Sequence, residues 1–585
     1  MNPETFFEEQ RRKAITQSQQ FGQKSTQFGW FRTAFFLIWV YGLYWALTSQ
    51  TIAVLGGIFL VGVLVFSLLI SAHNRINYQR DFFKGIQDLN KDEIRMSKGN
   101  FDDKEDGVRF LVKDHSFALD LDIFGKSSLY QRVDRTSLIP SKEKLATWLT
   151  NLASKKEAIR RQTAIQYLQQ HMTWVQSFLI TIQLGLGKKQ QDTKHEIEFM
   201  KVSNAQRAWS YVLACFPLPL FVLWIMGGIS GSYLLLAMII NSVFLGVFQK
   251  RLFKTGLDIS NSVRLIGTYA KGLQEIKMMA QQNPEWEREH ELTNSALKEV
   301  NKLSRLSHYL DARSNMFYWM FNAMFLLDVH LLSRVGRWYH QNSESLPEWL
   351  DLVHEMEVLC SMTSFTFQNP NYTFPELEEG SDKIKASSLG HPLMSGDECE
   401  VNDFEKGVEQ VVLITGSNMA GKSTFLRTVG INVVMAWVGL PVCADQMKVG
   451  QFNLWTCMRT TDDLSESKSS FYAELFRLQG LLKKIDESSL PVLYFLDEIL
   501  KGTNSQDRHD GAKGLIAKLI PTASYGFIST HDLELSDFYE QDPKIRNASF
   551  NSDLVGDDLQ FDYRLTAGKC RSTNASVLMK KMGLN

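Results

Sequence analysis

The sequence predicts a multidomain chain in which an α-helical region, interrupted by two apolar helical hairpins, is followed by a C-terminal α/β domain. Three observations predict this fold class. Amphipathic stretches such as residues 257–306 have the 3.6-residue period of helices. Two pairs of uncharged apolar runs interrupt them, and strand-like runs alternate with helical patterns after residue 361. At 585 residues, the chain is long enough for three or four domains.

The apolar runs form two pairs, each joined by a short turn. A helix needs about 20 residues to cross the hydrocarbon core, and each run approaches or reaches that length. Trp39, Tyr41, Tyr44 and Trp45 add the aromatic enrichment of membrane segments. Buried hairpins in a soluble protein are the alternative, but we favour two transmembrane hairpins. The runs are Thr33–Leu47, Ile52–Ala72, Ala208–Ile229 and Tyr233–Phe248.

Basic residues flank both hairpins, whereas the connecting turns contain none. By the positive-inside rule, both hairpins enter the membrane and return, so that the soluble regions face the cytoplasm. We therefore expect a multi-pass integral membrane protein, in the inner or plasma membrane of a prokaryote. No cleavable signal is expected, because about 30 mostly polar residues come first. The flanking basic residues are Arg11, Arg12, Lys13, Lys24, Arg75, Arg80, Lys84, Lys201, Arg207, Lys250, Arg251 and Lys254.

A glycine-rich turn links a strand-like run to a helix-like run at residues 411–424. Gly416 and Gly421-Lys422-Ser423 have the spacing of a phosphate-binding loop. In such a loop the glycines let backbone N–H groups surround the phosphates, and the lysine neutralises their charge. The Ser423 hydroxyl is then a ligand for Mg²⁺. The motif predicts ATP and Mg²⁺ as cofactors.

Two further strand ends supply polar side chains. The apolar run from Val492 ends in Asp497 and Glu498, so Asp497 is expected in the magnesium shell and Glu498 as the group that polarises water. A third run, Phe527 to Thr530, ends in His531, which we expect to sense the γ-phosphate.

These residues together resemble the ATPase domain of the MutS family in identity, order and spacing. A weaker resemblance to the start of the MutS core domain covers Val133–Thr136, Lys144-Leu145 and Trp148-Leu149, and Leu389–Pro392 is similar to the segment that leads into the ATPase domain. The stronger resemblance is carried by Gly416–Thr424, Thr461–Leu464, Ser469–Phe471, Glu474, Leu496–Ile499, Gly502-Thr503, Ser529–His531 and Leu565–Leu584.

The resemblance implies a composite site between two ATPase domains in a homodimer. Asn418 and Thr424 would join the nucleotide-binding loop, and Ser469 would reach the γ-phosphate in the opposite protomer. Three departures put the hydrolysis rate in doubt: Ser467 in place of a usual glycine, Leu500-Lys501 in place of the usual Gly-Arg, and a longer segment at 504–511.

The expected organisation follows from these motifs. Residues 317–332 contain Asp328 and His330 and are expected in a soluble core rather than in the membrane. Phe6-Phe7-Glu8 is interpreted as a chance match in a polar tail. The boundaries are 1–29 for a polar cytoplasmic segment, 30–72 for hairpin 1, 73–207 for the first core-like helical region, 208–249 for hairpin 2, 250–360 for the second, lever-like helical region, and 361–585 for the MutS-type ATPase domain.

Two functional hypotheses stay open. In the first, a membrane-anchored ATPase closes around double-stranded DNA, as in mismatch repair. In the second, ATP-driven dimer closure moves the hairpins or a protein partner without DNA. No mismatch-reading domain or C-terminal dimerisation tail is recognised, the net charge is −1, and the six cysteines form no C-x-x-C pair that would indicate a zinc site. Basic clusters at Lys155-Lys156, Arg160-Arg161 and 250–254 are candidate contacts for DNA phosphates, solvent or lipid headgroups.

Overall fold

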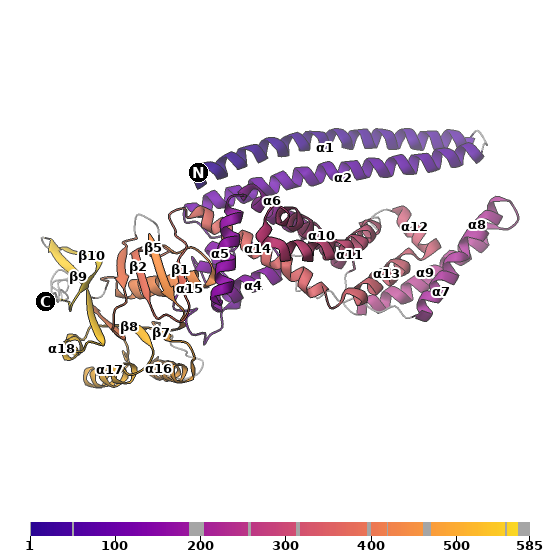
Figure 1. Cartoon of the computed structure of the whole chain (residues 1–585). Helices are drawn as coiled ribbons and strands as arrows, with labels where there is room; N and C mark the ends of the chain where they lie inside the picture. Colours follow the sequence, from indigo (N-terminus) through magenta and orange to yellow (C-terminus); the bar gives the residue numbers. More distant parts are fainter. Residues whose placement is uncertain are drawn as a thin grey trace.

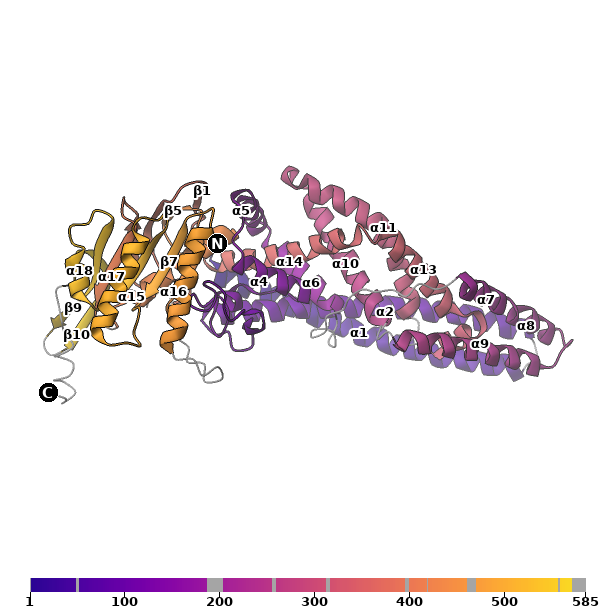
Figure 2. The same cartoon turned by 90° about the horizontal axis from the view of Figure 1, so that it is seen from below.

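The computed structural model describes residues 2–48, 52–186, 204–254, 259–311, 316–394, 399–417, 419–459, 470–555 and 558–570. Its N-terminal part is helical, and its C-terminal part contains two mixed sheets with helices (Figure 1). At this level the predicted fold class is confirmed. The C-terminal domain lies at one end of an elongated molecule, and two helical hairpins project towards the other end (Figures 1 and 2).

The first projection is a hairpin of two long helices, α1 (Pro3–Thr48) and α2 (Ile52–Ser97). Each has 46 residues and therefore spans roughly 70 Å. Polar contacts join them along their length: Ser25 donates to Asn77 Oδ1 at 2.6 Å, and the Trp39 indole donates to the Ile58 carbonyl at 3.0 Å. The helices continue unbroken through residues 29–30 and 72–73, where the sequence analysis placed boundaries.

The first turn of α1 is a packing anchor, so its interpretation as a polar tail was wrong. Phe7 is fully buried and Phe6 nearly so. Both rings meet Phe367 near the end of α14 (Leu346–Gln368), with centroid distances of 5.0 Å for Phe6 and 5.6 Å for Phe7. Burial of one such aromatic side chain stabilises the fold by about 2 kcal/mol, so the two rings together contribute several kcal/mol. This contact attaches the base of the first hairpin to the helix that leads into the C-terminal domain.

The second projection consists of α7 (Asn204–Cys215), α8 (Pro217–Ile225) and α9 (Gly231–Lys254). The helix breaks between α7 and α8 because Pro217 supplies no backbone N–H to continue the ladder. Two further helices pack beside this hairpin, α12 (Met316–Phe325) and α13 (Leu327–Asn342). Tyr318, Leu326 and Val329 are buried as expected for a core, but that core lies against the second hairpin.

Two stretches among the described residues are long and apolar enough to cross a membrane, Val54–Ser97 and Ala208–Ile225. In the most apolar window of each, 6% and 11% of the residues are buried. Gly231–Gly246 is a shorter apolar helix, and α1 does not meet the same criterion. By length and composition, the described chain therefore offers two of the four predicted spans.

The central helices share one core with the C-terminal domain. Arg135, in the segment after α3, forms a bidentate ion pair with Glu93 of α2 at 3.0 Å and also donates to Gln368 at 3.0 Å. The Arg135 and Glu93 side chains are 2% and 3% exposed, so this pair ties the first hairpin to the end of α14. The remaining helices of this part are α3 (Leu129–Val133), α4 (Ile139–Thr150), α5 (Lys155–Gln169), α6 (Met172–Leu186), α10 (Ile259–Ala280) and α11 (Glu287–Asp311), with short 3₁₀ turns at Val108–Phe110 and Pro284–Trp286.

A six-stranded sheet forms the centre of the C-terminal domain, in the order β10-β9-β4-β8-β7-β6. Every neighbouring pair is parallel except β9 with β10. A second sheet has the order β1-β5-β2-β3. The strands are β1 (Glu376–Glu378), β2 (Ile384–Leu389), β3 (Asn402–Glu405), β4 (Val411–Gly416), β5 (Gln446–Gly450), β6 (Asn453–Cys457), β7 (Val492–Asp497), β8 (Tyr525–Thr530), β9 (Ile545–Val555) and β10 (Asp558–Ala567); the helices are α15 (Lys422–Val438), α16 (Ser470–Glu487), α17 (Ser505–Leu519) and α18 (Leu533–Phe538).

Candidate functional site

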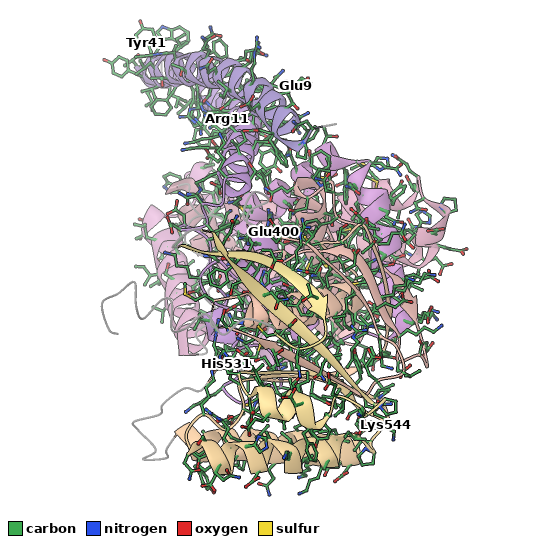
Figure 3. The ribbon with its side chains drawn as sticks, turned by 90° about the vertical axis from the view of Figure 1, so that its left-hand side faces the viewer. Glu9, Arg11, Tyr41, Glu400, His531 and Lys544 are labelled. Carbon is green, nitrogen blue, oxygen red and sulfur yellow. The ribbon has the colours of Figure 1, made fainter. Side chains whose placement is uncertain are left out.

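The sheet order brings the three predicted strand ends to one edge of the domain. Strand β8 pairs with β4 on one side and with β7 on the other, and all three are parallel. Their carboxyl ends therefore lie side by side, which is where α/β sheets bind ligands. The loop after β4, Asp497 at the end of β7 and His531 after β8 consequently belong to one site. Figure 3 shows His531 on this domain, far from Tyr41 on the projecting hairpin.

The turn from β4 to α15 requires glycine at two positions. A Cβ atom at Gly416 would lie 2.6 Å from the carbonyl oxygen of Phe550, and Gly421 has a φ of 106°. Within the turn, the Ser417 hydroxyl is buried and has no hydrogen-bond partner among the described residues. The sequence motif is thus explained by steric demands of the loop itself.

Lys422 begins α15 and turns its ammonium group back over this loop. Its Nζ donates to the carbonyl oxygens of Gly416 and Ser417, both at 2.8 Å. Burial lowers the pKa of Lys422, while the nearby carboxylates of Glu498 and Asp497 act in the opposite direction. The loop therefore holds a positive charge at its centre. Ser423 and Thr424 follow in the first turn of α15, half-buried and exposed respectively.

Ser529 organises the end of β7 from the neighbouring strand. Its hydroxyl donates to Asp497 Oδ1, and its carbonyl and hydroxyl oxygens each accept from the Glu498 N–H at 3.1 Å. The sequence analysis used Ser529 only as part of a motif and assigned it no role. A serine two residues before the strand-end histidine was the available signal, but its target required the pairing of β7 with β8.

Glu498 lies between the side chains of His531 and Lys501. Its Oε1 is 2.6 Å from His531 Nε2, and its Oε2 is 3.0 Å from Lys501 Nζ. The hydrogen bond from His531, with the Lys501 contact, holds the pKa of Glu498 at about 2 although burial opposes ionisation. The carboxylate is therefore ionised at neutral pH. Such a weak base is better suited to orienting water than to removing a proton from it.

The segment after Glu498 has an unusual backbone. Glu498 and Leu500 have φ values of 49° and 62°, in the left-handed region that non-glycine residues seldom adopt. The Leu500 N–H donates to Glu474 Oε1 of α16, and the leucine side chain lies against Gly511, where a Cβ would be 2.5 Å from Leu500 Cδ1. A buried carboxylate and a close glycine therefore hold a leucine where the resemblance led us to expect glycine.

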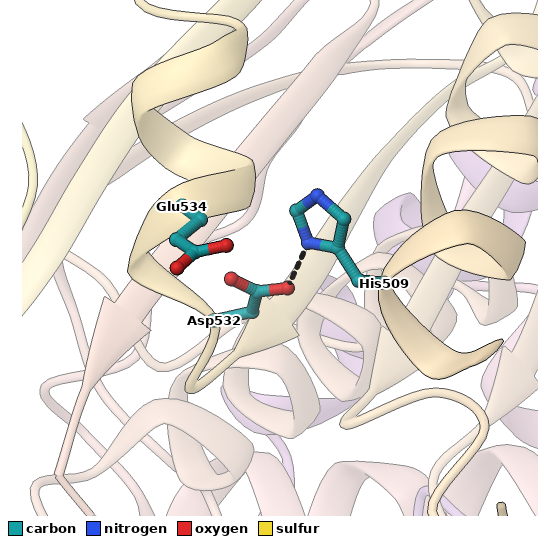
Figure 4. A group of neighbouring side chains, drawn as sticks. All are labelled: His509, Asp532 and Glu534. Atoms are coloured by element: carbon teal, nitrogen blue, oxygen red, sulfur yellow. Dashed lines mark hydrogen bonds and ion pairs between the residues drawn. The ribbon is translucent and has the colours of Figure 1, made fainter. Parts of the chain in front are cut away.

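A second group of polar side chains lies beside His531. His509 of α17, Asp532 and Glu534 offer ligand atoms within 4.8 Å of one another (Figure 4). His509 Nδ1 and Asp532 Oδ2 are 2.5 Å apart, so these two atoms already form a hydrogen bond with each other. The hydrogen bond connects α17 to the segment that carries His531.

Two predicted positions lie outside the described residues, Asn418 and Ser469, as does Ser467. Two arginines of one basic cluster pair within the protein, whereas Lys155 is half-buried and Lys156 is exposed. Arg160 contacts Glu157, Glu289 and Glu355, and Arg161 is 6% exposed. The Arg161 guanidinium donates to the Val438 carbonyl and covers the Trp148 ring at 3.5 Å. These two arginines therefore join α5 to α14 and α15, and acidic side chains of α5, α11 and α14 pair with the Arg160 charge, which disfavours these arginines as contacts for DNA phosphates.

Comparison with known proteins extends this picture. Residues 412–582 match the sequence model of MutS domain V. The chain is similar to the DNA mismatch repair protein MutS of Natronomonas pharaonis, with 29% identity over 247 residues, and to that of Acetivibrio thermocellus, with 32% identity over 221 residues. It is also similar to the DNA mismatch repair protein MSH6 of Arabidopsis thaliana, with 28% identity over 264 residues.

These matches cover part of each protein. They include 41%, 36% and 41% of this chain, but 28%, 25% and 20% of the respective relatives. The chain thus spans less than a third of the length of these curated relatives. The comparisons show a C-terminal domain that is similar to MutS domain V.

Proposed function

We propose that this protein is a Mg²⁺-dependent ATPase of the MutS type that is attached to a membrane by helical hairpins. One observation carries the ATPase proposal: parallel pairing of β4, β8 and β7 gathers Lys422, Asp497, Glu498 and His531 at one sheet edge. These are the residue types that phosphoryl transfer from a nucleoside triphosphate requires. The similarity to MutS domain V supports the same proposal.

The residues of the loop fit a triphosphate. The Ser417 hydroxyl is a buried polar group that has no hydrogen-bond partner within the described part of the chain, and a phosphate oxygen would satisfy it. Lys422 already points its charge at the loop interior. Ser423 and Asp497 would hold Mg²⁺, which neutralises phosphate charge when bound. Gly416, Gly421 and Thr424 would complete the phosphate-binding surface.

Glu498 and His531 would act on the attacking water. The carboxylate is ionised, and His531 fixes the position of its Oε1. We assign Glu498 the orientation of water and His531 the contact with the γ-phosphate. Asn418 and Ser469 complete the proposed site, Ser469 from the opposite protomer of a homodimer. Large apolar side chains that are exposed on this domain, Met419 at 81%, Tyr472 at 56% and Phe476 at 67%, support closure by a second copy.

The lipid bilayer is the proposed partner of the hairpins. Their far halves expose large apolar side chains, including Leu37, Ile38, Leu60 and Leu64 of the first hairpin and Leu235 of the second, each between 62% and 70% exposed. Water would penalise this surface, whereas hydrocarbon would not. Both hairpins project away from the C-terminal domain, so that domain would lie outside the hydrocarbon (Figure 1), and the basic residues that flank the hairpins favour the cytoplasmic side.

ATP turnover by the detergent-purified full chain tests the ATPase proposal. Lys422→Ala should abolish binding of a fluorescent ATP analogue. Glu498→Gln should keep binding and reduce kcat by about 10²-fold or more, the usual contribution of such a group. Lys385→Met, which removes a charge from an exposed pair with Glu405, is the matched control. Unchanged turnover in Glu498→Gln would overturn the assigned role.

DNA binding is the second candidate function. The names of the relatives favour it, since they are DNA mismatch repair proteins. The internal pairing of Arg160 and Arg161 removes one surface that would have supported it. Fluorescence anisotropy with matched and mismatched duplexes across a salt series distinguishes the candidates. ATP-dependent binding that weakens steeply with salt would support DNA as ligand. Turnover with no response to either duplex would favour a motor that acts on the membrane or on a protein partner.

A further inference from the structure

The Lys501 ammonium group contacts Oε2 of Glu498, the carboxylate that we propose orients the attacking water. With His531 on Oε1 and Lys501 on Oε2, both oxygens of Glu498 already have hydrogen-bonding partners. Each carboxylate oxygen can accept a further hydrogen bond from water, but these two contacts fix the orientation of the carboxylate. The two side chains are similarly exposed, 39% for His531 and 45% for Lys501, but the short His531 side chain directly follows β8, whereas Lys501 has a long flexible stem. Lys501 is therefore the partner that can leave at the lower cost.

The backbone between the two residues brings them together. Left-handed φ values at Glu498 and Leu500 fold the segment back on itself, so a lysine three residues on reaches the carboxylate. Glu474 of α16 holds this fold by accepting the Leu500 N–H through Oε1. The position of α16 thus determines how the Lys501 segment sits beside Glu498.

Glu474 also offers Lys501 an alternative partner. Its Oε2 is buried and has no hydrogen-bond partner among the described residues. Burial raises the pKa of Glu474, and the backbone N–H groups of Leu500 and Lys501 oppose this shift, followed by charge attraction from the nearby Lys501 ammonium group. An ammonium group that left Glu498 for Glu474 Oε2 would satisfy this buried oxygen.

We propose that Lys501 is a positioning residue that restrains Glu498 when paired with it and releases it by moving to Glu474. The inference deepens the proposed ATPase function and rests on it. Helix α16 begins at Ser470, directly after the segment from which Ser469 is proposed to reach the other protomer. Contact with a second protomer could therefore shift α16, and with it Glu474, which holds the segment beside Glu498. The pairing of Lys501 with Glu498, which we call the latch, would keep ATP turnover low in the single protomer.

Three variants test the latch in the full-length protein. Lys501→Met removes the charge and keeps the stem, Lys501→Arg keeps the charge, and Glu474→Gln keeps the acceptor for Leu500 while removing the alternative anion. Lys483→Met is the control, because Lys483 is 72% exposed in a loose pair with Glu487 on the same helix α16. We expect Lys501→Met to raise basal kcat about two- to fivefold, the range for a half-exposed ion pair, with KM for ATP unchanged. Lys501→Arg should restore the low rate.

Two further measurements separate the latch from a general structural effect. Amide hydrogen exchange of residues 498–503, measured without nucleotide, should become faster in Lys501→Met and stay unchanged in Lys483→Met. Glu474→Gln should lower kcat when Lys501 is present and should have no effect in the Lys501→Met background. That dependence is expected only if Glu474 acts through Lys501.

The outcomes are distinct. A fall in kcat of Lys501→Met with unchanged exchange would overturn the latch, because Lys501 would then act on the phosphates. Equal behaviour of Lys501→Met and Lys483→Met in both measurements would also overturn it. If the wild-type protein hydrolyses no ATP, the proposed function fails, and the exchange measurement alone decides whether Lys501 restrains Glu498.

Discussion

Two helical segments with runs of apolar residues have opposite surroundings in this molecule. In α2, Leu60, Val61 and Leu64 are 69%, 61% and 62% exposed. In α15, Val433 and Val434 are completely buried between the sheet and the central helices. An apolar run therefore does not reveal what will cover it. Other parts of the protein pack against α15, whereas we propose that lipid surrounds the apolar half of α2.

The contrast has an energetic reason. Complete burial of a leucine or valine side chain stabilises a fold by about 1.5–3 kcal/mol, so a domain that depends on α15 cannot lose its packing. The exposed half of α2 contributes little to the fold in this way. Its side chains are free to meet another phase, and substitutions there should change where the protein resides rather than whether it folds.

The largest expected effect is a charge in the buried segment. Val434→Asp would bury a carboxylate without a partner and should destabilise the C-terminal domain by roughly 5 kcal/mol or more, which would unfold it. Limited proteolysis and thermal unfolding measure this effect. Val54→Asp, at a position 42% exposed in α2, is the contrasting substitution and should leave the domain folded. Equal proteolytic sensitivity of the two variants would break the comparison.

The next effect concerns the contact that joins the two regions. Arg135→Met leaves Glu93 buried without its ion pair and should cost about 3–5 kcal/mol of unfolding free energy. Chemical denaturation in detergent measures it. Lys385→Met, from a pair that is 60% and 63% exposed, should cost about 1 kcal/mol or less. A loss of under 1 kcal/mol for Arg135→Met would mean that the first hairpin does not depend on this pair.

A charge in the exposed segment should act through the membrane. Leu64→Arg should leave the melting temperature of the C-terminal domain unchanged and weaken membrane insertion by about 3 kcal/mol. Carbonate extraction and flotation with liposomes measure the membrane-bound fraction. Ile159→Arg, at a position 42% exposed on α5, is the control and should not change that fraction. Unaltered flotation of Leu64→Arg would argue against lipid as the covering.

An effect of comparable size is expected from a pH dependence in the central core. Burial raises the pKa of Glu357 to about 7 from an ordinary value of 4.5, although the Ser137 N–H donates to it at 2.6 Å. The folded state therefore favours the protonated form. The resulting stability is complete below pH 4.5 and is lost as the pH rises through about 7, by up to about 3 kcal/mol.

Glu357→Gln should remove this loss. The variant should melt at a higher temperature than the wild type at pH 8 and at nearly the same temperature at pH 5. Differential scanning fluorimetry at both pH values provides the measurement. A constant difference between the two proteins at pH 5 and pH 8 would show that Glu357 does not titrate in this range.

Local patterns predicted much of the candidate site. The runs that end at Gly416 and Asp497 became parallel strands, because six consecutive buried residues in β4, and five buried residues before Asp497 in β7, suit a central sheet. The resemblance also marked Leu500 and Lys501 as departures. It did not show that Lys501 would pair with Glu498, since that contact depends on two left-handed residues and on Glu474 from another helix.

Predictions from charge and polarity were less successful. Arg160 and Arg161 looked like a surface cluster, and Phe6-Phe7 looked like part of a polar tail. Both sets are buried or paired because partners distant in sequence reach them, Glu355 for Arg160 and Phe367 for the two phenylalanines. A short window of sequence contains no information about such partners.

The sequence by itself determined the helix-rich N-terminal part, the C-terminal α/β character and the glycine-lysine loop, because these depend on local periodicity and local steric demands. The tertiary structure decided which residues meet: Ser529 with Asp497, Lys501 with Glu498, and Arg135 with Glu93 across 42 residues. It also decided which apolar runs are covered by protein. Those outcomes depend on strand order and helix packing, whose energies come from contacts between segments far apart in the chain.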